Sequence, residues 1–174
     1  WTRETTLMAP DGVSGDKFGA SVALSSDGSR AAITATYDAT PAGTRAGSVR
    51  VFRRTGTTWV QEATLLASDG MPSDFLGNGV AITGDGSRVV AGMPSRTSAG
   101  SARVFFRAGT VWTEEAILRG EAGPFGIQPC ITPDGTRIIA GNRNSITARV
   151  FLRAGTTWTE ETILRGPAGS SGQF

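Results

Sequence analysis

The chain has no histidine, and among its 174 residues there is one cysteine and one lysine. The absence of histidine excludes imidazole triads, imidazole general bases and histidine metal ligands. The single cysteine, Cys130, excludes a disulfide within the chain, and its apolar neighbours predict a small buried side chain. No apolar run approaches the roughly 18 residues of a membrane-spanning helix, so no membrane span is expected.

Neither sign of charge dominates the chain. It has 17 basic and 15 acidic residues, a net charge of +2, and the arginines are spread along the sequence. Nucleic-acid binding needs a basic patch or stripe, so we do not expect a nucleic-acid partner. The chain shows no signal peptide and opens on Trp1 instead of methionine, so we expect it to be a segment of a longer protein.

What the sequence does contain is a repeat. Similar segments begin at Trp1, Trp59, Trp112 and Trp158, with spacings of 58, 53 and 46 residues (59 − 1, 112 − 59 and 158 − 112). Each unit has an aromatic residue near a glycine, a short apolar run, an Asp-Gly turn, a second run and a strand with interleaved arginines. Asp-Gly between two β-prone runs is a strong hairpin signal, because both central residues of a type I′ turn need positive φ.

Four short strands joined by hairpins and repeated at this period are typical of propeller blades. We therefore predict an all-β fold, a β-propeller segment of about three four-stranded antiparallel blades. A β-sandwich is the alternative, but it has no reason to repeat its sequence at this period. The predicted organisation is a last strand of a preceding blade plus a linker in 1–17, blades in 18–74, 75–124 and 125–171, and the start of a next blade in 172–174.

The apolar positions of these runs predict the blade cores. The predicted core residues are Val22, Leu24, Ile33, Val49, Val51, Leu65, Val80, Ile82, Val90, Val104, Ile138, Ile139 and Val150. The recurring tryptophans are interpreted as packing anchors between blades, with sugar or protein binding as the alternative.

The segments GDKFGASVALSSDGSRAAITA and AGSVRVFRRTGTTWVQEATLLASDG carry a family resemblance. They resemble the FG-GAP repeats of bacterial and eukaryotic surface proteins, which are similar to the blades of the integrin α-subunit head. The resemblance implies a ring of about seven blades. This chain would form part of such a ring, or several copies of it would complete the ring by association. It also implies an extracellular or cell-surface location and a role in adhesion, recognition or surface architecture.

Calcium is the first candidate ligand that the resemblance raises. Integrin-type blades can hold Ca²⁺ in a hairpin loop with several aspartates, but here each loop keeps only its last one, in Asp27, Asp85 and Asp134. Calcium takes roughly six to eight oxygen ligands, several of them charged. The incomplete pattern therefore favours plain hairpin turns, and no cofactor is predicted.

Paired carboxylates recur as Glu114-Glu115 and Glu160-Glu161. Neighbours on a strand point to opposite faces, so neither pair is expected to form an acid–base dyad. A group copied from blade to blade is better explained as structural, with Arg103 and Arg149 as cross-strand partners. We therefore do not expect an enzyme.

The long loop between the second and third strands of the first unit is the best candidate for binding. Variable loops on a fixed scaffold commonly carry function. Its residues Tyr37, Asp38 and Arg45 are the candidate contacts to a protein or glycan partner at the cell surface. A solvated spacer is the alternative. The sequence thus predicts a non-catalytic extracellular scaffold, with two alternatives: a self-assembling subunit whose copies close a ring, and a propeller enzyme with a channel site.

Overall fold

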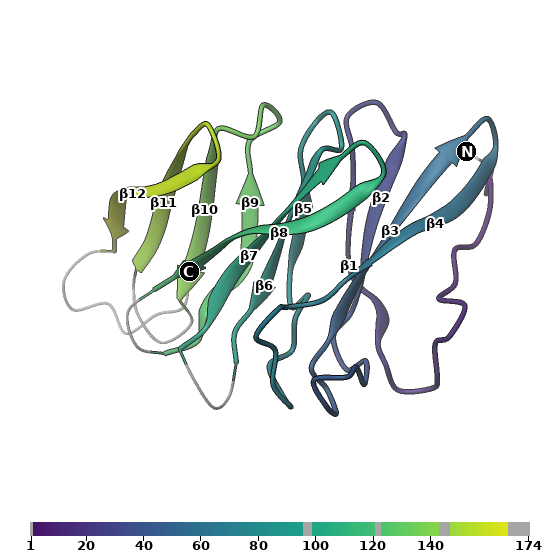
Figure 1. Cartoon of the computed structure of the whole chain (residues 1–174), viewed down its shortest axis with the longest axis horizontal. Coiled ribbons are helices and arrows are strands. Elements are labelled where there is room, and N and C mark those ends of the chain that lie inside the picture. The colour runs from purple at the N-terminus through teal and green to yellow at the C-terminus, as the bar shows by residue number, and fades with distance from the viewer. Residues whose placement is uncertain (1, 96–98, 121–122, 143–146, 167–174) are drawn as a thin grey trace.

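The chain folds as three consecutive four-stranded antiparallel sheets. The computed structural model describes residues 2–95, 99–120, 123–142 and 147–166, and the only regular structure in these ranges is β. The sheets, here called blades 1, 2 and 3, each keep the strand order of the sequence and stand side by side (Figure 1). The predicted propeller segment is confirmed.

The strands of each blade are as follows. Blade 1 contains β1 (Phe18–Leu24), β2 (Arg30–Ala35), β3 (Ser48–Thr55) and β4 (Thr58–Leu65). Blade 2 contains β5 (Val80–Ile82), β6 (Arg88–Met93), β7 (Ser101–Ala108) and β8 (Val111–Arg119). Blade 3 contains β9 (Phe125–Ile131), β10 (Arg137–Asn142), β11 (Thr147–Ala154) and β12 (Thr157–Arg165). The proposed start of a next blade at 172–174 lies outside the described residues.

The first hairpin turns of blades 1 and 2 each bond to the first turn of the following blade. In blade 1, Ser26 donates its N–H to the carbonyl of Gly84 at 2.9 Å, and Gly84 donates its own N–H to the carbonyl of Pro133 at 2.8 Å. These two bonds form a short ladder from turn to turn. They place the first strands β1, β5 and β9 next to one another.

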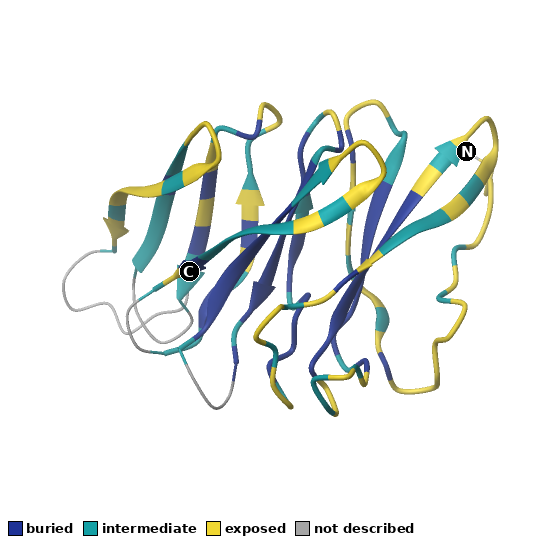
Figure 2. Ribbon diagram, in the orientation of Figure 1, coloured by how far each residue is buried: buried dark blue, intermediate teal, exposed yellow. Residues whose placement is uncertain are grey.

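The core lies between the blades and not within any one of them. One buried cluster lies between blades 1 and 2, and a second lies between blades 2 and 3. In blades 1 and 2 the buried residues concentrate on the two middle strands (Figure 2). Eight of the predicted core residues belong to these clusters, namely Val49, Val51, Leu65, Val80, Ile82, Val90, Val104 and Ile138. Ile33 is also buried, but it lines a hollow on the outer face of blade 1. Val150 is half-buried.

Four predicted buried residues are exposed, and the prediction for them was wrong. Val22 and Leu24 on β1 are 65% and 60% exposed, Ile139 on β10 is 38% exposed, and Cys130 on β9 is exposed. Val22 and Leu24 lie on the face of blade 1 that points away from blade 2, and Cys130 and Ile139 lie on the face of blade 3 that points away from blade 2. No other blade covers either face within the described residues, so alternation along the strand is not enough to bury them.

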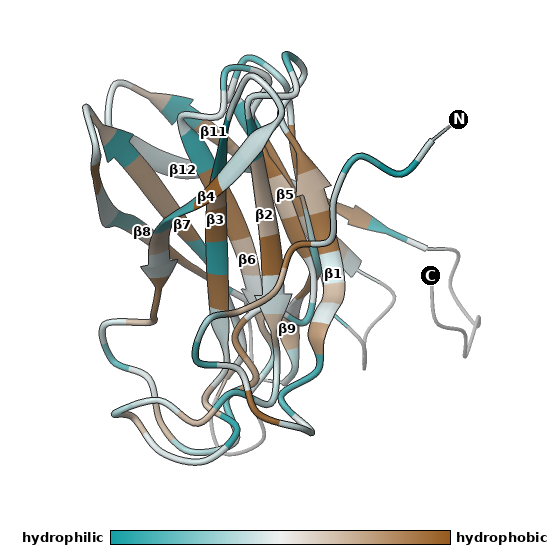
Figure 3. Ribbon diagram, turned by 90° about the vertical axis from the view of Figure 1, so that its right-hand side faces the viewer, coloured by the Kyte–Doolittle hydropathy of each residue, from teal (hydrophilic) through white to brown (hydrophobic). Residues whose placement is uncertain are grey.

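Residues 2–17 also differ from the expected strand. They hold no strand, because the described part of the chain offers no neighbouring strand with which they could pair. Instead the segment crosses in front of β1 and β2 (Figure 3). It borders an open hollow of about 490 Å³, lined by Leu7, Val22, Leu24, Trp59 and others.

Glycine is required where blades approach most closely. Gly47 and Gly126 have φ values of 84° and 86°. A Cβ on Gly47 would lie 2.3 Å from the carbonyl oxygen of Leu76, and a Cβ on Gly126 would lie 2.1 Å from that of Ser101. Each glycine thus lets the backbone of one blade lie directly against that of the next. None of the described residues belongs to a helix that could cross a membrane.

Candidate functional site: clasps between blades and a loop face

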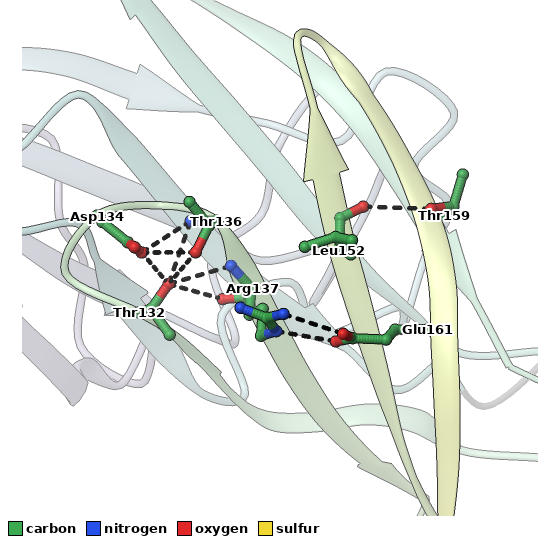
Figure 4. Close-up of polar contacts among 7 residues, drawn as sticks. All are labelled: Thr132, Asp134, Thr136, Arg137, Leu152, Thr159 and Glu161. Carbon is green, nitrogen blue, oxygen red and sulfur yellow. Dashed lines mark hydrogen bonds and ion pairs between the residues drawn. The ribbon is translucent and has the colours of Figure 1, made fainter.

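Each blade contains an arginine–glutamate pair that joins its second strand to its fourth. The guanidinium donates two hydrogen bonds to the carboxylate, at 2.9 to 3.2 Å. Bidentate pairing of this kind fixes both side chains. We call these pairs the clasps: Arg30–Glu62, Arg88–Glu115 and Arg137–Glu161, the last of which is drawn in Figure 4.

A tryptophan of the following blade reaches each of the first two clasps. Trp158 of blade 3 donates its indole N–H to Glu115 of blade 2 at 3.2 Å. Trp112 of blade 2 lies near Glu62 of blade 1 and helps to lower the pKa of Glu62. Its indole N–H does not have the geometry of a hydrogen bond. Both indoles also pack against the buried clusters between the blades. The tryptophans therefore anchor one blade to the next, as the sequence suggested.

Glu4 repeats this contact at the outer face of blade 1. It accepts two hydrogen bonds from Arg54, at 2.9 and 2.8 Å, and one from the indole of Trp59 at 3.3 Å. Glu4 follows Trp1 by three residues, just as Glu62 follows Trp59. It therefore occupies the glutamate position of the repeat, although residues 2–17 form no strand.

The clasps keep their carboxylates ionised. Burial raises the pKa of Glu115, but bonds from Arg88 and Trp158 more than offset this, so that its pKa lies below the ordinary value. Glu62 shows the same balance, with Arg30 as the main opposing group. The pKa of Glu161 is lowered mainly by its bond to Arg137. A depressed pKa with a fixed cationic partner suits a structural ion pair and not a general acid.

A second set of ion pairs lies on the opposite face of each blade. Arg103 of β7 binds Glu114 of β8 at 3.1 Å and also reaches Asp69, in the segment before blade 2, at 2.6 Å. The predicted pairs Arg103–Glu114 and Arg149–Glu160 are confirmed. The adjacent glutamates of each doublet thus point to opposite faces and form no dyad.

The clasps themselves were missed at the sequence level. The signal was available, since a glutamate follows each of the four tryptophans by three residues. Its meaning depends on how the blades stack, because the indole meets the glutamate of the preceding unit and not its own.

The three hairpin aspartates that were weighed as calcium ligands are used by their own turns. Asp27 accepts hydrogen bonds from the Ser25 hydroxyl at 2.6 Å and the Ser29 N–H at 2.9 Å, which lower its pKa to about 2. Asp85 and Asp134 repeat this arrangement, and Figure 4 shows it for Asp134. The described residues contain no cluster of three or more histidine, cysteine, aspartate or glutamate side chains that could hold a metal ion.

Tyr37 is half-buried in the loop between β2 and β3, and two cations lie against its ring. The Lys17 ammonium lies 4.0 Å from the centroid of the Tyr37 ring, and the Arg45 guanidinium carbon lies 5.0 Å from it. The ring of Phe75 packs beside it, with centroids 5.5 Å apart. Such contacts between cations and a ring are attractive, and they gather two exposed positive charges at one place. We call Lys17, Tyr37, Arg45 and Phe75 the loop-face cluster.

Asp38 has a different environment from Tyr37 and Arg45. It is buried, and its carboxylate accepts hydrogen bonds from the Ser48 hydroxyl at 2.6 Å and from Arg50 at 2.9 Å. These bonds hold the base of the loop to β3. The structure thus brings two of the three candidate binding residues together and places the third beneath them.

The loop itself is held on both sides. The carbonyls of Thr44, Arg45 and Ala46 accept backbone hydrogen bonds from Ser73, Phe75 and Leu76 at 2.9 to 3.1 Å. A hollow of about 250 Å³ lies beside it, lined by residues that include Thr40, Pro41, Leu66 and Gly70. These backbone bonds hold the end of the loop against the segment that precedes blade 2.

Comparison with known families and structures supplies the family. The model described as an FG-GAP repeat matches residues 1–52 and 59–105, which is more than half of the chain. The chain belongs to the FG-GAP repeat family. No curated protein matches this FG-GAP repeat chain significantly.

Solved structures show the same fold at low identity. The FG-GAP repeat chain superposes on a proposed 6-phosphogluconolactonase from Bacteroides fragilis with a TM-score of 0.63 and 18% identity, covering 83% of this chain and 38% of that one. A structure of KlAtg21 in complex with the coiled coil of AgAtg16 gives a TM-score of 0.63 at 16% identity, covering 85% and 43%. This chain thus spans about two fifths of their length, and the likeness concerns the fold alone.

Proposed function

We propose that the chain is a non-catalytic part of an extracellular β-propeller, and that it recognises its partner through the loop-face cluster. One observation supports this most directly. The ion pairs between strands recur from blade to blade, whereas the chain's only lysine and only tyrosine meet once, in this cluster. A group that departs from the repeat is a better candidate for recognition than one that every blade shares.

Backbone geometry supports the same place. Lys17, Arg45, Ser73 and Phe75 have φ values between 56° and 65°, although none of them is glycine. Such conformations are costly and tend to persist where the surroundings impose them, often at ligand sites. Three of these four residues belong to the loop-face cluster.

The chemistry of the cluster favours an anionic group on the partner. Lys17 and Arg45 are exposed and positively charged, and both lie against the ring of the half-buried Tyr37. A carboxylate or sulfate of a surface protein or glycan would meet two cations and a ring. The family resemblance supports the extracellular location and the role in adhesion or surface architecture.

The experiment is a binding screen of the purified chain against arrayed glycans, including sialylated and sulfated ones, and against immobilised acidic surface proteins. Tyr37→Ala and Arg45→Ala are each expected to weaken binding about tenfold, in line with losses at central aromatic and arginine contacts. Arg165→Ala is the matched control, because Arg165 is exposed at the end of β12, far along the sequence from the cluster.

Two results would contradict the proposal. Binding that persists unchanged in both variants would place recognition elsewhere. Chemical change of a bound glycan during prolonged incubation, followed by mass spectrometry, would contradict the non-catalytic role.

A further inference from the structure

The two outermost blades each present an exposed apolar face. On blade 1, the outer face contains Val22 and Leu24, which are 65% and 60% exposed. On blade 3, the outer face contains Cys130, Ile139 and Leu164, and the last two are 38% and 50% exposed. Contiguous exposed apolar residues commonly mark an interaction surface.

Within the chain, the equivalent positions are buried against a neighbouring blade. Leu118 of blade 2 corresponds to Leu164 and is 5% exposed, and Val90 corresponds to Ile139 and is fully buried. Val80 and Ile82 of blade 2 correspond to Val22 and Leu24, and both are 9% exposed. The two outer faces are therefore the two halves of one interface that the chain already forms twice.

The polar groups of the two faces match as well. Glu161 on blade 3 is bound by Arg137 of its own blade, and within the described ranges no indole contributes to its pKa, unlike Glu62 and Glu115. On blade 1, Trp59 and Arg54 hold the positions from which Trp158 and Arg153 face Glu115. Blade 1 thus presents the donors, and blade 3 presents the acceptor.

We propose that the outer face of blade 3 binds the outer face of blade 1 of a second copy of this chain, head to tail. Glu161 of one copy accepts a hydrogen bond from the Trp59 indole of the other and lies near its Arg54, as Glu115 does with Trp158 and Arg153, and Ile139 and Leu164 cover Val22 and Leu24. A head-to-tail contact of this kind leads to a closed ring or an open chain of copies, depending on the rotation between them. The partner is a second copy because both complementary faces belong to this sequence.

The N-terminal segment regulates this contact. Glu4 already binds Arg54 and Trp59, so it competes with Glu161 for the same donors. It does not cover Val22 and Leu24, which remain exposed beside it. The contact depends on side chains, because Pro133 has no N–H with which to extend the ladder of turn bonds.

Sedimentation velocity and light scattering across protein concentrations from about 1 to 200 µM test the proposal. The wild-type chain is expected to associate as its concentration rises. Glu161→Gln is expected to raise the apparent Kd at least about tenfold, because removing one partner of a charged pair at an interface weakens binding by that much or more. Ile139→Arg is expected to abolish association, and Glu4→Gln, by freeing Arg54 and Trp59, is expected to lower the apparent Kd.

The control is Val111→Arg, because Val111 is 61% exposed at the tip of the β7–β8 hairpin, outside both faces. It should leave association unchanged, and circular dichroism should show the same fold for all variants. A chain that stays monomeric throughout the range would overturn the proposal and leave the faces to other blades, whether of this protein or of another. Association that survives both Glu161→Gln and Ile139→Arg would overturn it too, since the contact would then use another surface.

Discussion

Replacing Glu115 by glutamine is expected to destabilise the protein by about 3 kcal/mol, the lower end of the range for breaking a buried ion pair. The side chains of Arg88 and Glu115 are only 10% and 6% exposed. The substitution leaves the Arg88 guanidinium charged, enclosed and without its anion, and it weakens the bond from Trp158. For a chain of this length, such a loss corresponds to a fall in Tm of about 6 to 12 °C.

Glu161→Gln provides the matched comparison. The Arg137–Glu161 clasp has the same bidentate geometry, at 2.9 and 3.0 Å, but its side chains are 49% and 33% exposed. Exposed ion pairs contribute little because water screens them, so this variant should melt close to the wild-type temperature. Scanning fluorimetry and urea titration at pH 7, at concentrations where the wild type is monomeric, measure both. Equal losses in the two variants would refute the reasoning, since the cover of a neighbouring blade would then make no difference.

Two further predictions concern the backbone and pH. Gly126→Ala should prevent stable docking of blade 3, because the new Cβ would lie 2.1 Å from a carbonyl oxygen. Gly155→Ala should cost only backbone strain, because its Cβ would have no other atom within 4 Å. Denaturant titrations compare the stability of the two variants. Asp27 and Asp134 have a folded pKa of about 2, below the unfolded value of about 3.9. Their stabilisation is therefore complete above about pH 5 and is lost as the pH falls through 4 toward 2. Tm should drop across that window, and it should drop less steeply in the double variant Asp27→Asn, Asp134→Asn.

The repeat made the fold predictable, because its features are local. Asp-Gly turns, alternating strands and regularly spaced tryptophans are each readable within a few residues, and their recurrence predicts equal blades. Burial was harder to predict. Val22 and Val80 occupy the same place in the repeat, yet among the described residues only Val80 has a blade packed against it. Exposure depends on the neighbour of a blade, which its own sequence does not describe.

The candidate site was predictable only in part for a similar reason. Tyr37 and Arg45 were expected in a binding loop, and the structure places them together with Lys17, a residue from before the first strand. Asp38 had the same polar character in the sequence, but Ser48 and Arg50 fold over it. Whether a loop carboxylate faces a ligand or the scaffold depends on tertiary partners that spacing along the chain does not reveal.

Pro133 gives the series of blades a polarity with a practical consequence. The N–H of Ser26 donates to the carbonyl of Gly84 in the next blade, and the N–H of Gly84 donates to the carbonyl of Pro133. Pro133 has no N–H, so it cannot donate to a following blade in the same way. The three units are therefore not interchangeable parts. An engineered array that moves the third unit to an interior slot would lose one main-chain bond at that junction, and restoring it would require a residue with an amide hydrogen at this one position.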